Sequence, residues 1–168
     1  MKLAAFAVPV LLATLATGSP GQSQPTASAA ALCAGPPAAP TPAFGGTTRA
    51  RLDAAPVTFT NRWASAGKPV FSHVIEGRPG RVHLTLETCS SATGGETVAI
   101  YPATAAGQRM PRKPRVMFSI AVPRGNVRHA IVTIPAARSG IGSVHIAVVV
   151  ENASGRFHQG AYRLTASR

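Results

Sequence analysis

Acidic residues are the scarcest feature of this chain. Of its 168 residues only 5 are Asp or Glu, whereas 17 are Lys or Arg, which gives a formal net charge of +12. Acid and base catalysis of the glycosidase kind needs two carboxylates that face one cleft. The acidic residues are scattered over different predicted strands and turns, at Asp53, Glu76, Glu87, Glu96 and Glu151. The composition therefore argues against a hydrolase that works with a carboxylate pair.

Motifs for nucleophilic catalysis are also absent from the sequence. A nucleophilic Ser or Cys needs a neighbouring base that is itself oriented by a third group. The sequence contains no G-x-S-x-G elbow, and its single Asp, Asp53, lies close to the predicted beginning of the folded domain. We therefore predict a noncatalytic protein with no catalytic residues and no cofactor.

Aromatic residues make up only 5% of the chain. Binding of single-stranded nucleic acid through stacking needs aromatic side chains interleaved with cations, so the sequence predicts no specific nucleic-acid partner. An aromatic platform for sugar rings has two candidates, Trp63 and Tyr101. For Trp63, in the stretch NRWASAGK, the favoured interpretation is a partly buried side chain that closes the edge of the domain.

Only the first residues resemble an export or membrane signal. MKLAAFAVPVLLATLATG carries one Lys, an apolar run from Leu3 to Leu15 and then small residues, which is typical of a secretory signal peptide. The run is shorter than the ~20 apolar residues that span a membrane. We predict a signal peptide over residues 1–18, with a second small-x-small cleavage site as late as residue 29. The mature chain is then secreted or periplasmic and has no transmembrane segment.

Residues 19–48 are rich in Pro, Ala, Gly, Ser and Thr. Such a composition cannot bury enough apolar surface to offset its ordering entropy, so we predict a flexible leader before the folded domain. The chain has two cysteines, Cys33 in this leader and Cys89 in the domain. In an oxidising compartment they form the one possible intramolecular disulfide, and the alternative is two unpaired thiols. Their spacing carries no metal-site signature.

From residue 49 onward the hydrophobic pattern has a period of two. In GRVHLTLET, for example, Val82, Leu84 and Leu86 alternate with His83, Thr85 and Glu87. Similar runs recur, separated by turn sequences such as GRPG, TGG, PRGN and NASG, and no window shows helical periodicity outside the signal peptide. We predict an all-β domain over residues 49–168, an antiparallel two-sheet sandwich, jelly-roll-like, of about eight strands. The apolar run from Val144 to Val150 predicts a central strand buried on both faces.

Two stretches of the domain resemble one family. PVFSHVIEGRPGRVHLTLET and VTIPAARSGIGSVHIAVVVENASGRFHQGAYRLTAS, which ends in a G-x-Y-x-L of Gly160, Tyr162 and Leu164, resemble bacterial pre-peptidase C-terminal (PPC) domains over about residues 69–167. The resemblance implies a β-sandwich in which Tyr162 packs inward. PPC domains are appendages of secreted enzymes and are proposed to aid solubility, processing or substrate adhesion. The acidic turn residues that are sometimes associated with calcium in that family are absent here.

The excess of arginine favours anionic partners, such as an anionic polymer, an envelope surface or an extracellular protein surface. The densest group of cations is GQRMPRKPRV, with Arg109, Arg112, Lys113 and Arg115, in a long connection between the strand that ends at Tyr101 and the strand that begins at Val116. Two prolines in it oppose helix formation. The connection is either a grip for an anion or a solvated loop.

Histidines provide an alternative function. His83 and Glu87 share one face of a predicted strand, and His73 and His145 lie in strands that could neighbour it. Imidazole and carboxylate are ligands for copper and zinc, so these residues are the candidates for a periplasmic metal-binding protein. No pair has H-x-H spacing, and sandwich strands often carry isolated outward histidines.

Overall fold

The computed structural model describes residues 31, 32, 34, 42–90, 96–103, 116–122, 127–152 and 154–168. These residues form nine β-strands. The strands are β1 Phe44–Leu52, β2 Val57–Ser65, β3 Val70–Gly77, β4 Gly80–Ser90, β5 Glu96–Pro102, β6 Phe118–Val122, β7 Val127–Ile134, β8 Gly142–Asn152 and β9 His158–Ser167.

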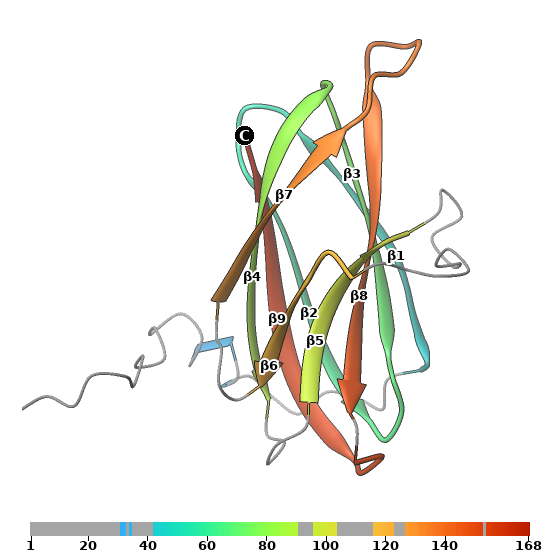
Figure 1. The fold of residues 1–168 in the computed structure, drawn as a ribbon, viewed down its shortest axis with the longest axis vertical. Coiled ribbons are helices and arrows are strands. Elements are labelled where there is room, and N and C mark those ends of the chain that lie inside the picture. The colour runs from blue at the N-terminus through green and yellow to red at the C-terminus, as the bar shows by residue number, and fades with distance from the viewer. Residues whose placement is uncertain are drawn as a thin grey trace, which may run out of the picture.

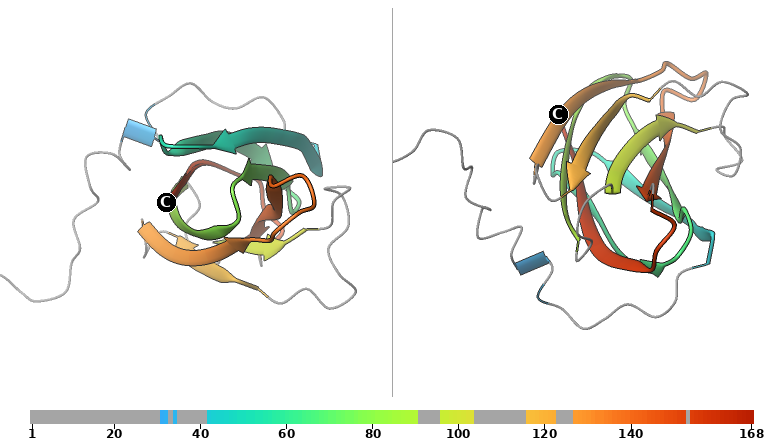
Figure 2. Two further views of the ribbon diagram at one scale, coloured as in Figure 1. Left: turned by 90° about the horizontal axis from the view of Figure 1, so that it is seen from above. Right: turned by 60° about the horizontal axis from the view of Figure 1, so that its bottom comes forward.

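The strands make two sheets that face each other (Figures 1 and 2). The five-stranded sheet has the order β1-β3-β8-β5-β6, and the four-stranded sheet has the order β2-β9-β4-β7. All pairings are antiparallel except that of β1 with β3, which is parallel. The predicted two-sheet β-sandwich is thus confirmed, with one parallel pair at its edge.

Alternation along the strands places the core between the sheets. In β4, the side chains of Val82, Leu84 and Leu86 have no exposed surface and pack in one apolar cluster with residues of both sheets. Tyr162 and Leu164 of β9 belong to the same cluster, so Tyr162 packs inward as expected. Burial of this apolar surface is the main stabilising contribution to such a fold.

Strand β8 confirms the predicted central strand. It lies between β3 and β5, and every residue from Ile146 to Val150 is at most 3% exposed. A strand covered on both faces needs apolar residues at consecutive positions, which explains why its sequence lacks alternation.

Strand β1 corrects the predicted beginning of the domain. The structure has nine strands instead of about eight, and β1 begins at Phe44, inside the segment 19–48 assigned to the leader. The sequence FGGTTRARL has little apolar alternation, so it carries no strand signal of its own. Its backbone pairs with β3 from Phe44 opposite Val70 to Leu52 opposite Gly77, and Leu52 is buried in the core.

The predicted signal peptide, residues 1–18, lies outside the described residues, as does most of the predicted leader. Among the residues that are described, none belongs to a helix long and apolar enough to cross a membrane.

Candidate functional site

A pocket lined by three arginines lies at one end of the sandwich. It has a volume of about 480 Å³. We call it the arginine pocket; its lining residues are Arg51, Leu52, Asp53, Ala54, Arg78 and Arg168.

Strand pairing brings three distant segments of the chain to this end. Leu52 at the end of β1 lies opposite Gly77 at the end of β3, which places the β1–β2 connection beside the β3–β4 turn. Ser167 of β9 lies opposite His83 of β4, so the last residue, Arg168, follows toward the beginning of β4. In Figure 1 the C-terminal end of the chain accordingly lies beside the β1–β2 connection.

Two glycines make room for the side chain of Arg168. A Cβ atom added to Gly77 would lie 3.1 Å from Arg168 Nη2, and one added to Gly80 would lie 3.2 Å from Arg168 Nη1. Gly80 also has a φ of +140°, which side-chain-bearing residues rarely adopt. Arg168 Nη2 donates a hydrogen bond of 2.5 Å to the carbonyl oxygen of Arg78. The GRPG turn therefore positions this guanidinium at the pocket.

The pocket has more positive than negative charge. Its lining contains three guanidinium groups and one carboxylate, Asp53, which accepts from Arg51 Nε at 3.1 Å. Both side chains of that pair are more than half exposed, at 58% and 61%, so the pair is screened by water. In the described part of the chain, Arg78 and Arg168 form no ion pair.

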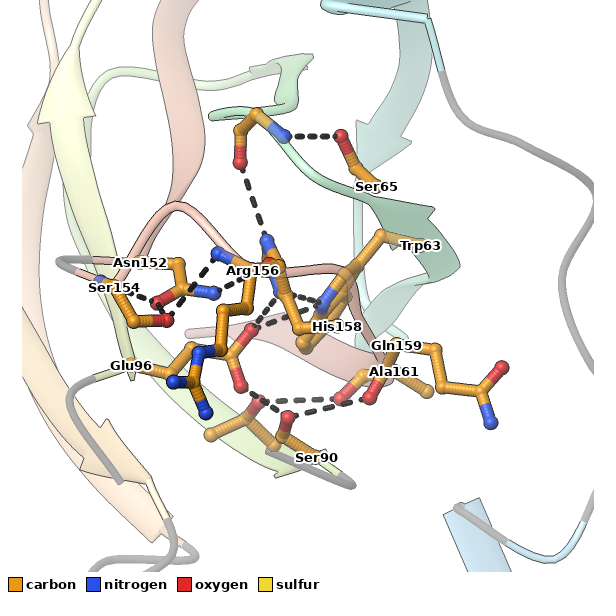
Figure 3. A network of polar contacts seen from close by, with 12 residues as sticks. Trp63, Ser65, Ser90, Glu96, Asn152, Ser154, Arg156, His158, Gln159 and Ala161 are labelled. Carbon is orange, nitrogen blue, oxygen red and sulfur yellow. Dashed lines mark hydrogen bonds and ion pairs between the residues drawn. The ribbon is translucent and has the colours of Figure 1, made fainter. Parts of the chain in front are cut away.

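A second group of polar side chains lies buried at the interface of the two sheets (Figure 3). We call it the Glu96 cluster; it consists of Trp63, Ser90, Glu96 and His158. Trp63 Nε1 donates to Glu96 Oε1 at 3.1 Å, His158 Nδ1 contacts the same oxygen, and the Ser90 hydroxyl contacts Glu96 Oε2. The side chains of Glu96 and His158 are at most 1% exposed.

The contacts of His158 indicate the role of the Glu96 cluster. His158 Nδ1 faces the Glu96 carboxylate, and His158 Nε2 faces the carbonyl oxygen of Gly67 at 3.2 Å. Trp63 Nε1 also lies 3.1 Å from His158 Nδ1, so both ring nitrogens have partners within the protein. Ser90 contacts the carboxylate and not the imidazole, which is not the arrangement of a Ser–His–acid nucleophile. The cluster links β2, β4, β5 and β9 and is a structural element.

The predicted metal candidates lie in three separate places. His73 is buried between the sheets, where its Nε2 lies 2.6 Å from the Tyr162 hydroxyl and its Nδ1 lies 2.5 Å from Thr48 Oγ1. Burial lowers the pKa of His73 from 6.5 to about 4, so the ring is neutral at physiological pH. The same burial raises the pKa of Tyr162 well above 10.

His83 and Glu87 do share one face of β4, the outer face of the four-stranded sheet, where Glu87 accepts from Arg163 Nη1 at 3.1 Å. His145 belongs to β8 in the other sheet, and its Nε2 lies 3.3 Å from Ser143 Oγ. The expectation that the strands of His73 and His145 could neighbour β4 is wrong, because β3 and β8 pair within the five-stranded sheet. Within the described ranges no three His, Cys, Asp or Glu side chains come together as metal ligands.

Trp63 also differs from its predicted placement. It has no exposed surface, whereas the sequence suggested a partly buried edge residue. Tyr101 is half-buried, and its hydroxyl donates to Glu151 Oε1 at 3.3 Å. The two side chains considered for a sugar platform therefore do not form one.

Several predicted residues lie outside the described part of the structure. Arg109, Arg112, Lys113 and Arg115 are among them, and so is Cys33. Cys89 is described, near the end of β4 opposite Ala161. The anion grip and the Cys33–Cys89 disulfide therefore stay predictions.

Comparison with known proteins gives similarities at the level of solved structures. No family model and no curated protein sequence matches the chain. The chain is similar to the pre-peptidase C-terminal domain of a collagenase from Bacillus anthracis, with 11% identity, a TM-score of 0.39, and coverage of 73% of this chain and 95% of that one. This is the family that the sequence resembles.

Two further solved structures show similarity of the same order. The C-terminal carbohydrate-binding module (CBM6) of a marine laminarinase from Zobellia galactanivorans has 10% identity and a TM-score of 0.39, covering 68% of this chain and 100% of that one. A mitogen from Yersinia pseudotuberculosis has 12% identity and a TM-score of 0.36, covering 68% of this chain and 86% of that one.

The arginine pocket is the feature that sequence reasoning missed. Arg51, Arg78 and Arg168 are far apart in the chain and share no local motif. The GRPG turn is the one local feature that points to this pocket. Its first and last residues are glycines, which leave room for a distant arginine side chain to approach.

Proposed function

We propose that this chain is an exported, noncatalytic β-sandwich module that contacts an anionic polymer, an envelope surface or an acidic protein surface through its arginines. The arginine pocket is the observation that carries the proposal. It collects three guanidinium groups around one side-chain carboxylate, in a chain whose formal net charge is +12. Residues 1–18, which have the layout of a secretory signal peptide, support export.

Other features support a noncatalytic role. The Glu96 cluster is buried and internally satisfied, and His73 uses both ring nitrogens inside the core. Glu76 and Glu87 accept from Arg49 and Arg163, Asp53 accepts from Arg51, and Glu151 accepts from Tyr101. Each of these described carboxylates thus has a partner within the protein, which supports a structural role for it.

The disulfide belongs to the same proposal. Leu32 is buried, and its carbonyl oxygen accepts a hydrogen bond of 2.8 Å from Arg62 Nη2. Arg62 lies opposite Ala161, and Ala161 lies opposite Cys89 on its other side. The residue before Cys33 thus contacts the strand row that contains Cys89, which supports a Cys33–Cys89 bridge that ties the leader to the four-stranded sheet.

The electrostatic proposal predicts binding that depends on salt. We expect the purified mature protein to be retained on heparin and on vesicles of anionic lipid at low ionic strength. Retention should weaken steadily as salt is raised, because the Debye length falls to about 8 Å at 0.15 M. The measurement is the salt concentration at which the bound protein is released. Absence of retention at low salt, or retention that salt does not change, would contradict the proposal.

The loop cations give a second prediction. If Arg109, Arg112, Lys113 and Arg115 form a grip, replacing all four with Gln lowers the salt needed for elution far more than replacing four exposed cations elsewhere. A matched control set is Lys68, Arg81, Arg128 and Arg138, all exposed and outside the arginine pocket. Equal shifts in elution for the two sets would assign the loop to the general positive surface.

A further inference from the structure

We propose that the arginine pocket binds one acidic sugar unit of an anionic polysaccharide, with the oxyanion of that unit held by the arginines. The ligand chemistry is an oxyanion attached to a sugar ring, either a carboxylate or a sulfate ester. This inference rests on the proposed function, since it names the ligand class and the site for a module that contacts anions.

The charges of the pocket favour an oxyanion as the ligand. Each guanidinium offers five N–H donors in a planar fork, which matches carboxylate and sulfate oxygens with paired hydrogen bonds. Asp53 accepts from Arg51 alone, while Arg78 and Arg168 have no carboxylate partner among the described side chains. An incoming oxyanion offers acceptors for N–H donors of the three arginines beyond those that bond to Asp53 and to the carbonyl oxygen of Arg78.

The pocket is arranged before a ligand arrives. The Arg168 guanidinium lies over Gly77 and Gly80 and donates to the carbonyl oxygen of Arg78. A cation that is already positioned loses less side-chain entropy on binding than a free surface arginine. Arg168 is exposed like Arg81, Arg128 and Arg138, and its hydrogen bond to the carbonyl oxygen of Arg78 is what positions it.

The shape and the walls of the pocket favour a sugar over other anions. Its volume of about 480 Å³ lies within the range of ~300–1,000 Å³ typical of small-molecule sites. Ala54, which is exposed, provides an apolar surface for the carbon face of a ring. None of the lining residues is aromatic, so the pocket lacks the ring platform on which bases usually stack. A lipid bilayer is broad and flat, and would engage a raised surface more readily than a hollow.

Blocking the pocket without changing its charge is the decisive experiment. Ala54 is exposed and lines the pocket, so Ala54→Tyr fills the hollow, and Ala54→Ser leaves it open. Affinities for polygalacturonate, which carries carboxylates, and for dextran sulfate, which carries sulfate esters, are measured by calorimetry at 0.15 M salt. We expect Ala54→Tyr to weaken binding of at least one polymer by about tenfold. Ala54→Ser should bind as the original protein does.

Arginine variants test whether the positive charge of the pocket contributes to binding. The double variant Arg78→Gln/Arg168→Gln should weaken binding about tenfold, and the control Arg128→Gln/Arg138→Gln should weaken it less than about threefold. The polymer that loses more affinity identifies the oxyanion as carboxylate or sulfate. Thermal unfolding of each variant checks that the fold is intact.

The outcomes separate this inference from the proposed function. If both double variants weaken binding equally and Ala54→Tyr has no effect, the pocket inference is overturned and the general electrostatic function stands. A similar loss of single-stranded DNA binding on Ala54→Tyr would overturn the sugar assignment. If the unaltered protein binds neither polymer nor heparin at low salt, the proposed function fails.

Discussion

Replacing Glu96 with Ala should destabilise the domain by about 3–5 kcal/mol, because it removes a buried carboxylate that three polar side chains contact. The carboxylate of Glu96 accepts from Trp63 Nε1 and contacts both His158 Nδ1 and the Ser90 hydroxyl. With Ala at this position, the Ser90 hydroxyl and the His158 ring lose their contacts with the carboxylate, and Trp63 Nε1 keeps only His158 Nδ1, 3.1 Å away. The free energy of unfolding from urea titrations, at constant pH, measures the effect.

Glu76→Ala is the matched control. Glu76 pairs with Arg49 at 3.2 Å, but the two side chains are 61% exposed for Arg49 and 40% exposed for Glu76. Exposed ion pairs contribute about 0–1 kcal/mol, so this variant should unfold close to the original midpoint. Glu96→Gln keeps the volume and one acceptor and should fall between the two. Equal stabilities for Glu96→Ala and Glu76→Ala would show that the buried contacts of Glu96 do not stabilise the fold.

The second large effect is a loss of stability at mildly acidic pH that originates in His73. Its pKa is about 4 in the folded chain, against 6.5 for an unperturbed ring. The folded state therefore favours the neutral ring, so the contribution is complete above pH 6.5 and is lost as the pH falls from 6.5 toward 4. A difference of this size corresponds to about 3 kcal/mol. Around the ring lie Phe59, Tyr162 and Thr48, none of which supplies a counter-charge.

The measurement is the free energy of unfolding at intervals between pH 7 and pH 4, for the original protein and two variants. His73→Gln is less stable at pH 7 because it loses the stack on Phe59, but its stability should change less with pH in this range. His129→Gln alters an exposed histidine of β7 that contacts Thr85 Oγ1, and it should keep the original slope. Parallel slopes for all three proteins would exclude His73 as the source.

The sequence predicted the fold class where residues alternate strongly. GRVHLTLET and the apolar run of β8 specify their faces locally, since a shift by one residue would expose Val82, Leu84 and Leu86. Strand β1 was missed because its position depends on backbone pairing with β3 and on one buried anchor, Leu52. Backbone pairing of this kind does not require apolar and polar residues to alternate, so FGGTTRARL shows no alternation.

The candidate site could not be predicted from the sequence for a related reason. Arg51, Arg78 and Arg168 come together only after β1 pairs with β3 and β9 pairs with β4. The Glu96 cluster likewise joins residues from both sheets, and Glu96 taken alone looked like one of five scattered carboxylates. The sequence allowed the strands of His73 and His145 to neighbour that of His83, because strand order cannot be read from strand patterns.

The strand order also sets when the domain can fold. Without β8, the five-stranded sheet separates into the pairs β1–β3 and β5–β6, and without β9 the four-stranded sheet separates into β2 and the pair β4–β7. These two connecting strands are the last in the chain, from Gly142 to Ser167. As the chain emerges from the ribosome, neither sheet can be completed until its final strands are made. Because pairings between distant segments form slowly, this order predicts that both sheets close late in folding.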